Sequence, residues 1–409
     1  MKDFFNVTPL ETVLEWVSRT HRAGTEAIEL FQSQGRVLAQ DLVADDDLPP
    51  FARSTMDGYA VKARSTFGAS EGTPAYLSVK GSVAMAERPY FRVEDGEAAR
   101  IPTGGMVPEN ADSVVMIEHA DTLGETAIEV YRSVAPGQNV IEKGEDFKKG
   151  ATVLEAGTLL RPQEAGVLAA FGKDPILVYK RPVIGIISTG DEVVPVTAVP
   201  RTGSIRDMNT HTLSGLVRQN GGTPRSYGIV KDQKAPLFQT LERAVMETDM
   251  VLVSGGSSVG VRDFTLDAIS SLADSKILVH GIAISPGKPT ILASATGKFV
   301  WGIPGHVTSA MIVFCMVVKP FLDHLRGIAL SSREAPEIRA ILTRNVPSSQ
   351  GRRDFIRVRL IKKGAALYAE PILGKSGLIH TMVRADGVIA VGMNDEGVLE
   401  GTEVQVIPI

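Results

Sequence analysis

The sequence predicts a multidomain α/β protein that combines a helical linker domain, a β-rich domain, a doubly wound α/β domain and a small C-terminal β-barrel. Three observations support this prediction. The chain has 409 residues, more than one hydrophobic core usually serves. Apolar strands alternate with helical patterns between residues 177 and 327. Short alternating strands separated by turns lie on either side of that segment.

The helical domain is predicted from two separate stretches, residues 1–44 and 144–176. Thr8, Pro9 and Glu11 form the pattern of a helix start, with a capping hydroxyl, a proline in the first turn and an early acid. A second helical pattern over residues 27–31 ends at Gly35, a typical stop. Residues 144–176 return to a helical pattern, so the two stretches are expected to form one discontinuous domain.

Residues 45–143 predict the β-rich domain, which lies between the two helical stretches. Alternating strands are expected at residues 75–79, 98–101 and 113–117, with glycine-containing turns between them.

Residues 177–328 predict the α/β domain. Strands are expected at 183–187, 224–229 and 250–254, with helices between them. Sheets of this kind bind ligands at the carboxyl ends of their strands.

Residues 333–409 predict the small barrel. Apolar and charged side chains alternate within residues 355–360, and closing strands are expected at 387–391 and 403–407.

The loop that follows residue 253 is the most informative stretch of the sequence. An apolar strand enters a Gly/Ser loop, and Asp263 then opens a helical pattern. Glycines let the backbone approach a ligand and turn its N–H groups inward, and serine hydroxyls and a helix start add donors for an anion. A carboxylate beside such donors is expected to hold Mg²⁺ or to act as an acid or base. The alternative is a plain strand-to-helix turn with Asp263 as its N-cap.

Charge and cysteine content exclude several classes of protein. The net charge is −4 without a long basic run, which disfavours nucleic-acid binding. Cys315 is the single cysteine and is predicted to be a buried hydrophobe, so no disulfide forms within the chain and a cytoplasmic location is expected.

The longest apolar run, residues 310–318, is too short to cross a bilayer. The N-terminus has no signal-peptide pattern.

Eight segments of the chain, taken in order, resemble the signatures of one family. They are residues 49–61, 100–105, 144–146, 188–192, 207–209, 254–263, 286–289 and 302–305. The chain thereby resembles the molybdopterin molybdenumtransferases, the MoeA group to which the E domain of gephyrin belongs. The resemblance covers essentially the whole chain.

The resemblance implies an enzyme of molybdenum cofactor biosynthesis. Such enzymes take adenylylated molybdopterin, release AMP with the help of Mg²⁺, and insert molybdate into the dithiolene. The resemblance implies an elongated homodimer whose clefts lie between the α/β domain of one subunit and the β-rich domain of the other. It also implies the molybdopterin adenylyltransferase and apo-molybdoenzymes or their chaperones as partners, with no nucleic acid and no membrane.

Residue chemistry and the resemblance together indicate the site residues. The residues expected to act on the phosphoanhydride and the oxyanion are Asp57, Thr103, Glu192, Asp232, Asp263 and Lys288. Asp57 and Thr103 are expected to come from the partner subunit. The expected metal ligands are Glu192, Asp263 and Asp191. The residues expected to bind the pterin substrate are Ser254, Gly255, Gly256, Ser257, Ser258, Gly260, Pro304, Gly305, Arg352, Arg353 and Ser376.

Several of these residues also fit ordinary structural roles. Asp191 and Asp207 fit helix caps or turns, Asp232 fits a loop before a helix, and Asp57 fits an Asp-Gly turn. One of the adjacent Arg352 and Arg353 is expected to face solvent.

Three positions depart from the family pattern. Ser285 stands where a lysine is common, His306 where an asparagine is common, and Ile141 where an arginine is common. These departures leave open whether molybdate or tungstate is preferred. Two further alternatives are a non-catalytic molybdopterin-binding scaffold and an enzyme with other chemistry on a pterin or nucleotide.

Overall fold

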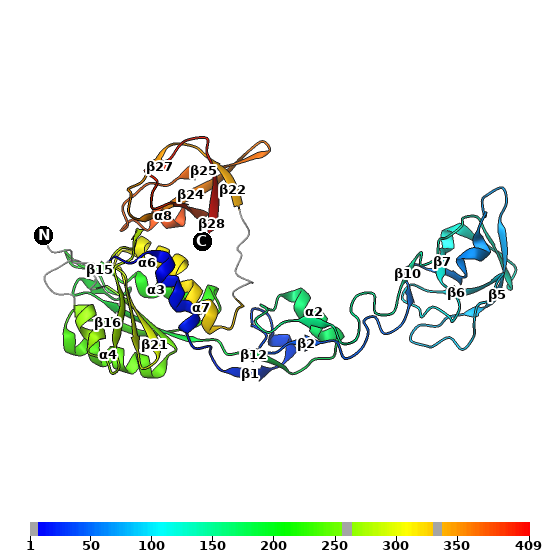
Figure 1. The fold of residues 1–409 in the computed structure, drawn as a ribbon, viewed down its shortest axis with the longest axis horizontal. Helices are drawn as coiled ribbons and strands as arrows, with labels where there is room; N and C mark the ends of the chain where they lie inside the picture. The colour runs from blue at the N-terminus through cyan, green and yellow to red at the C-terminus, as the bar shows by residue number, and fades with distance from the viewer. Residues whose placement is uncertain (1–6, 256–263, 330–337) are drawn as a thin grey trace. The chain divides into compact units, whose positions relative to one another are not determined.

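The computed structural model describes residues 7–255, 264–329 and 338–409 (Figure 1). The chain forms two compact units. The first consists of Met1–Gln40, Ala156–Arg161 and Pro175–Ile409, and the second of Asp41–Glu155 and Pro162–Asp174. The division into four domains stays a prediction.

A six-stranded sheet forms the centre of the first unit, with the order β16-β13-β17-β21-β20-β18. Its first four strands are parallel, and β20 runs antiparallel to both of its neighbours. The strands are β13 (Val183–Thr189), β16 (Thr223–Val230), β17 (Met250–Ser254), β18 (Lys276–His280), β20 (Ile291–Ala295) and β21 (Lys298–Ile303).

The prediction of a parallel sheet is therefore correct for β16, β13, β17 and β21 and wrong at the edge formed by β20 and β18. Thr296 and Gly297 connect β20 to β21, and their φ angles are +48° and +77°. Two consecutive residues with positive φ form the tight turn that joins antiparallel strands, so this segment returns as a hairpin instead of crossing over through a helix.

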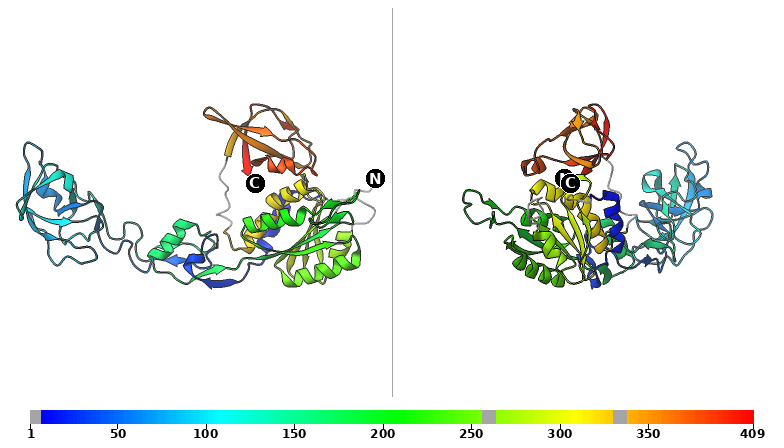
Figure 2. Two further views of the ribbon diagram at one scale, coloured as in Figure 1. Left: turned by 180° about the vertical axis from the view of Figure 1, so that it is seen from behind. Right: turned by 60° about the vertical axis from the view of Figure 1, so that its left-hand side comes forward.

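Helices cover both faces of the sheet (Figure 2). Ile186 and Leu252 face a core shared with α1, α3, α6 and α7, whereas Ile187 and Val253 face a core shared with α4 and α5. Burial on both faces explains the nearly continuous apolar runs of these strands. The helices are α1 (Leu10–Leu14), α3 (Asn209–Gln219), α4 (Lys234–Glu247), α5 (Phe264–Ser270), α6 (Val307–Val313) and α7 (Lys319–Leu325).

A π-helical turn, Phe314–Val318, joins α6 to α7, so Val307–Leu325 is one continuous helix of 19 residues. Its length and its mean hydropathy of 1.4 would by themselves suit a helix that spans a membrane. Because 67% of it is buried and it packs in the core with Trp301 and Phe299, it has the properties of a core helix.

Cys315 lies in the π-helical turn, where burial raises its pKa to about 11. Only about one thiol in a thousand is then ionised at pH 8, and the thiolate is the reactive form. We expect the native protein to react very slowly with a disulfide reagent such as dithionitrobenzoate at pH 8. The same protein in guanidinium chloride should react at once. Rapid stoichiometric labelling of the folded protein would contradict this prediction.

The C-terminal strands form a closed barrel of five strands, as predicted. Its strand order is β24-β25-β22-β28-β26, and pairing of β26 with β24 closes it. Its strands are β22 (Ile338–Leu342), β24 (Arg353–Lys363), β25 (Ala366–Pro371), β26 (Gly387–Val391) and β28 (Glu403–Pro408), with β23 (Val346–Pro347), β27 (Gly397–Val398) and α8 (His380–Val383) in its connections.

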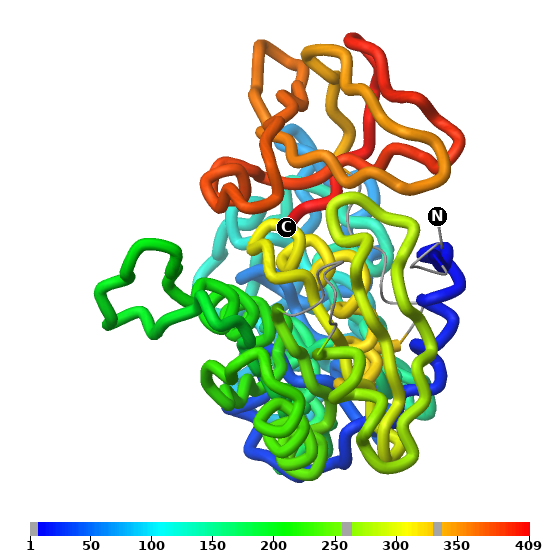
Figure 3. Tube along the Cα trace, turned by 90° about the vertical axis from the view of Figure 1, so that its left-hand side faces the viewer, coloured from blue at the N-terminus to red at the C-terminus, as the bar shows by residue number. Residues whose placement is uncertain are grey.

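The barrel is joined to the α/β sheet region by a short ladder. In β19 (Ile284–Ser285), Ile284 pairs in parallel with Arg353, and Ser285 pairs with Asp354. Figure 3 shows the orange and red tube of the barrel beside the yellow segment that leads into α6. There the backbone N–H of Thr308 donates to the carbonyl of Ser376 over 3.1 Å.

The N-terminal predictions hold only in part. The residue at the N-cap of α1 is Pro9, and Thr8 forms a parallel bridge with Ile282. The helix expected over residues 27–31 is present only as a short 3-10 turn, Leu30–Gln32, which follows a strand. β1 (Thr25–Ile28) alternates between exposed and half-buried residues and pairs with β12 (Ile176–Tyr179), whose branched and aromatic residues favour a strand.

The second unit contains one helix of the stretch 144–176, α2 (Pro162–Ala170), at the position expected from the sequence. The rest of that stretch is not helical. The strand β11 (Thr152–Leu154) pairs with β2 (Leu42–Val43), and β10 (Val140–Ile141) pairs with β3 (Arg53–Ser54).

A six-stranded sheet confirms the β-rich part of the second unit. Its order is β7-β4-β6-β5-β9-β8. Separate clusters around Val61 and Ala60 bury its two faces. The strands are β4 (Gly58–Val61), β5 (Ala75–Ser82), β6 (Glu97–Ile101), β7 (Ser113–Met116), β8 (Ala120–Leu123) and β9 (Ala127–Val130).

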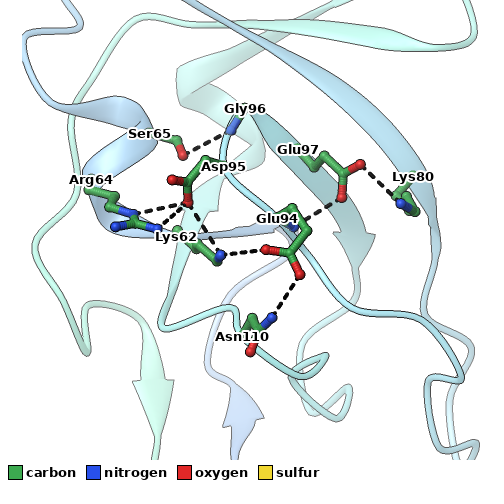
Figure 4. Close-up of polar contacts among 9 residues, drawn as sticks. All are labelled: Lys62, Arg64, Ser65, Lys80, Glu94, Asp95, Gly96, Glu97 and Asn110. Carbon is green, nitrogen blue, oxygen red and sulfur yellow. Dashed lines mark hydrogen bonds and ion pairs between the residues drawn. The ribbon is translucent and has the colours of Figure 1, made fainter.

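A network of ion pairs fixes the turn that leads into β6 (Figure 4). Lys62 lies 2.8 Å from Glu94 and 3.3 Å from Asp95, and Arg64 also pairs with Asp95. The hydrogen bond that Glu94 accepts from Lys62 lowers the pKa of Glu94. Because the carboxylates are exposed, the network orients the turn more than it stabilises the fold.

Candidate active site

A cavity of about 810 Å³ lies at the carboxyl ends of the parallel strands, where the barrel meets the α/β sheet region. Residues at the ends of β13 and β17 form one wall, and the segment after β21 continues it. Residues of β19 and the loop after it, of β24, and of the loop after β25 form the rest. The cavity thus occupies the position at which open α/β sheets bind ligands.

Charged side chains of both signs line this cavity. The cations are Arg206, Lys288, Arg352 and Arg357, and the carboxylates are Glu192, Asp207 and Asp354. A cavity with this lining suits a ligand that carries negative charge as well as hydrogen-bond donors.

The barrel contributes two buried charges to the cavity. Asp354 is only 4% exposed; it accepts a hydrogen bond of 2.9 Å from the Ser348 hydroxyl, and Arg352 Nε lies 2.9 Å from its Oδ1. Arg357 is 7% exposed and donates to the carbonyl of Gly374 over 2.9 Å.

The guanidinium of Arg357 has an unusual environment. Burial lowers its pKa, and no carboxylate of the described residues lies within ion-pair distance of it. Burying a cation is costly without an anion close to it, so the position of Arg357 at the cavity makes it a candidate to bind an anionic group of a ligand.

Buried polar atoms without a hydrogen-bond partner concentrate at this cavity. Seven such side-chain atoms occur among the described residues, and four of them belong to cavity residues: Asn209 Oδ1, Arg352 Nε, Asp354 Oδ1 and Arg357 Nε. The contact between Arg352 and Asp354 is close but not aligned as a hydrogen bond. Since buried polar groups are almost always paired, the other two atoms, Asn209 Oδ1 and Arg357 Nε, mark a site for a polar ligand.

The amide of Asn209 is oriented by its neighbours. Its Nδ2 donates to Ser254 Oγ over 2.6 Å and to the carbonyl of Gly305 over 2.7 Å. Because a carbonyl accepts only, the amide cannot be turned around, and Oδ1 remains an acceptor for a donor on the ligand.

Three family models match this chain in sequence order. They are the MoeA N-terminal region (domain I and II) over residues 8–172, the "Probable molybdopterin binding domain" over residues 185–324, and the MoeA C-terminal region (domain IV) over residues 339–409. The chain belongs to the MoeA family. The cavity described above is formed by the second and third of these regions.

Individual relatives agree with membership of the MoeA family. The chain is 31% identical to the molybdopterin molybdenumtransferase of Bacillus subtilis strain 168, covering 98% of this chain and 94% of the relative. It is 34% identical to the enzyme of the same name from Nostoc sp. PCC 7120, covering 75% of this chain and 70% of the relative. A crystal structure of the molybdopterin biosynthesis MoeA protein of Pyrococcus horikoshii OT3 matches with a TM-score of 0.85 at 32% identity, covering 99% of this chain and 100% of the other.

Eight residues predicted from the MoeA resemblance come together at the cavity. They are Glu192, Ser254, Gly255, Lys288, Pro304, Gly305, Arg352 and Ser376. Gly255 has a second reason to be glycine, because its φ is +117° and a Cβ atom would lie 2.0 Å from the carbonyl oxygen of Thr189.

Three predicted residues of the first unit do not line the cavity. Arg353 forms an ion pair of 2.8 Å with Glu11, so of the two adjacent arginines it is Arg352 that reaches the cavity. Asp232 accepts a hydrogen bond of 2.6 Å from the hydroxyl of Thr189, a cavity residue, and its backbone N–H lies 3.3 Å from Asp191 Oδ1. Neither aspartate is among the residues that line the cavity.

Asp57 and Thr103 belong to the second unit, where they contact each other. Asp57 Oδ1 accepts hydrogen bonds from the backbone N–H of Thr103 over 2.7 Å and from its hydroxyl over 3.0 Å. These hydrogen bonds lower the pKa of Asp57. Five predicted residues, Gly256, Ser257, Ser258, Gly260 and Asp263, lie outside the described residues.

The sequence analysis did not single out Arg206, Asp354 or Arg357, and it treated Asn209 only as part of a segment. One signal was present. Arg357 follows Phe355 by two residues in β24, so both point to the same side of the strand. A cation that shares the buried face with a phenylalanine is an exception to the binary pattern and therefore a candidate site residue.

Proposed function

We propose that this chain is a molybdopterin molybdenumtransferase that releases AMP from adenylylated molybdopterin and inserts molybdenum in a late step of molybdenum cofactor biosynthesis. Relatives that match almost the whole chain carry this name. The observation that carries the proposal is the cavity with three barrel and loop cations, in which two buried polar atoms, Asn209 Oδ1 and Arg357 Nε, have no partner among the described residues. A pterin phosphate and a tetrahedral oxyanion supply the negative charge and the donors that these atoms lack.

Two cations of the cavity are proposed to bind the oxyanion. Lys288 is a compact charge on the loop after β19, and Arg352 presents a guanidinium from the barrel. Positive groups placed around a phosphoanhydride or an oxyanion stabilise the charge that develops in transfer. We assign Lys288, Arg352 and the hydroxyl of Ser376 to the oxyanion, because all three line the cavity.

Mg²⁺ belongs to the proposal because the acidic residues fit it. Glu192 and Asp207 both line the cavity, and Mg²⁺ prefers carboxylate oxygens and phosphate as ligands. No group of three His, Cys, Asp or Glu residues in the described part of the chain is close enough to hold a metal by itself. Glu192 is the proposed ligand that lines the cavity; Asp191, the residue before it, and Asp263, which lies outside the described residues, are the other two proposed ligands. The ion would neutralise the phosphoanhydride when it is bound.

The direct test is incubation of the purified protein with adenylylated molybdopterin, Mg²⁺ and molybdate, followed by measurement of AMP. We expect AMP release that stops when EDTA is added and returns with excess Mg²⁺. Replacement of molybdate by tungstate shows which oxyanion is preferred. Tight substrate binding without AMP release under any of these conditions would favour the scaffold function instead.

We further propose a homodimer in which Asp57 and Thr103 of one subunit complete the cavity of the other. The support for this proposal is the family resemblance together with the ionised, exposed carboxylate of Asp57. The proposed location is the cytoplasm. The proposed partners are the molybdopterin adenylyltransferase, which would supply the substrate, and apo-molybdoenzymes or their chaperones, which would receive the product.

Mixing two inactive variants tests the shared cavity. Asp57→Ala and Lys288→Ala should each be inactive alone. Asp57→Ala removes the carboxylate that the second unit would contribute to every cavity, and Lys288→Ala removes a cation of the first unit from every cavity. After subunit exchange, half of the dimers are hybrids, and each hybrid has one intact cavity. About a quarter of all cavities should therefore regain activity. If mass spectrometry shows exchange but AMP release stays absent, Asp57 acts within its own chain or has only a structural role.

A further inference from the structure

A short side-chain contact connects the two walls of the cavity. His306 Nδ1 lies 2.8 Å from Ser376 Oγ, and both residues line the cavity. His306 directly precedes α6, and Ser376 lies in the loop between β25 and α8. The backbone of this loop is held separately, since Thr308 donates to the carbonyl of Ser376 over 3.1 Å. The side-chain contact therefore decides the direction of the serine hydroxyl rather than the position of the loop.

The direction of that hydroxyl depends on the protonation of the imidazole. A serine hydroxyl has one proton to donate. If Nδ1 is unprotonated, it accepts this proton and Ser376 presents only lone pairs to the cavity. If Nδ1 carries a proton, it donates to Oγ, and the hydroxyl proton can point at a ligand. A neutral ring can adopt either tautomer, whereas the protonated ring always donates.

We propose that His306 is a positioning residue that couples oxyanion binding at Ser376 to the uptake of one proton. The inference rests on the proposed function, which places a tetrahedral oxyanion in this cavity. The proton comes from solvent, to which His306 is exposed, and adds to the ring nitrogen without changing any other bond. Binding of a dianion then favours the protonated ring in two ways. The dianion attracts the positive charge of the ring, and the hydroxyl of Ser376, which no longer donates to the ring, can donate to the dianion.

A bound anion supports this coupling by its charge. An anion in the cavity favours a positive charge on a ring that lines the same cavity. The charged groups that line the same cavity as His306 are Lys288, Arg206, Arg352, Arg357, Glu192, Asp207 and Asp354. Lys375 lies in the loop of Ser376, and His380 begins α8. Asp354 is engaged by Arg352 and Ser348.

Calorimetric titration with sulfate and with molybdate tests the proposal on the full-length protein. Sulfate is a tetrahedral dianion that stays ionised throughout the range in which imidazoles titrate, about pH 5 to about pH 8. We expect affinity to rise about tenfold between pH 8 and pH 6, the effect of one additional charge-assisted contact. Buffers with different ionisation enthalpies should show proton uptake on binding.

Three variants make the test specific. His306→Asn keeps a hydrogen-bonding side chain but cannot titrate, so binding should lose its pH dependence and its proton uptake. Ser376→Ala should flatten the pH dependence as well, because the hydroxyl is absent. His211→Asn is the matched control, since His211 is an exposed histidine of α3 outside the cavity lining. It should titrate like the wild type. Thermal unfolding of each variant checks that it is folded.

The outcomes separate the inference from the function on which it rests. If wild-type protein binds either oxyanion with the same affinity at both pH values, or if folded His306→Asn keeps the pH dependence, the coupling is wrong and the proposed function stands. If no variant binds either oxyanion at any pH, both the oxyanion site and the coupling are overturned. Loss of AMP release without any loss of oxyanion binding in His306→Asn would also contradict the positioning role.

Discussion

Arg357→Met is expected to lower kcat/KM for AMP release by about a hundredfold, the usual effect of losing a charge that stabilises the reacting groups. The thermal unfolding temperature should stay the same or rise. Arg357 is 7% exposed and has no carboxylate partner among the described residues. Replacing a buried, uncompensated charge by an apolar side chain of similar length removes a desolvation penalty from the empty protein.

The combination of lost activity and retained stability is the informative result. Arg359→Met, two residues further along the same strand, is the matched control. Arg359 is exposed and outside the cavity lining, so its loss should change neither activity nor unfolding temperature appreciably. If Arg357→Met unfolds the protein instead, the guanidinium serves mainly to hold Gly374 and its loop, and the assignment to an anionic ligand is wrong.

Gly255→Ala is expected to destabilise the protein by about 3–5 kcal/mol and to abolish AMP release. The φ of Gly255 is +117°, and a Cβ atom would lie 2.0 Å from the carbonyl oxygen of Thr189. Neither backbone can yield easily, because Ser188 and Ser254 are neighbours in the central sheet. Strained backbone together with a clash accounts for the size of the effect.

Gly305→Ala provides the stability control for that substitution. The nearest atom to a Cβ at this position is the Cα of Gly255, at 3.6 Å, and the φ of Gly305 is not positive. We expect this variant to unfold within about 1 kcal/mol of the wild type in guanidinium chloride. Equal stability of both alanine variants would show that the loop after β17 relaxes more readily than its packing indicates.

The local order of strands and loops could be predicted because it depends on neighbouring residues. The apolar run Met250–Ser254 is buried on both faces, as its composition indicates. Lys288 and Glu192 were also correctly expected near strand ends, because loops after parallel strands gather at one edge of the sheet.

Contacts between distant segments could not be predicted in the same way. The pairing of Ile284 and Ser285 with Arg353 and Asp354 involves only two residues on each side, too few to produce a periodic signal. The choice between Arg352 and Arg353 depends on which side of the strand faces the cavity. The ion pair of Arg353 with Glu11, a residue of α1, shows this choice.

The ladder between β19 and β24 also limits how this chain can exchange parts with its relatives. It joins the segment before Lys288 to the strand that bears Arg357. Ile284 and Arg353, which pair in this ladder, are 69 positions apart in the sequence. A chimera whose crossover falls between these positions would combine a loop and a barrel with different ancestries. Gene recombination should therefore preserve the two segments as one inherited pair, and functional chimeras should carry both from the same parent.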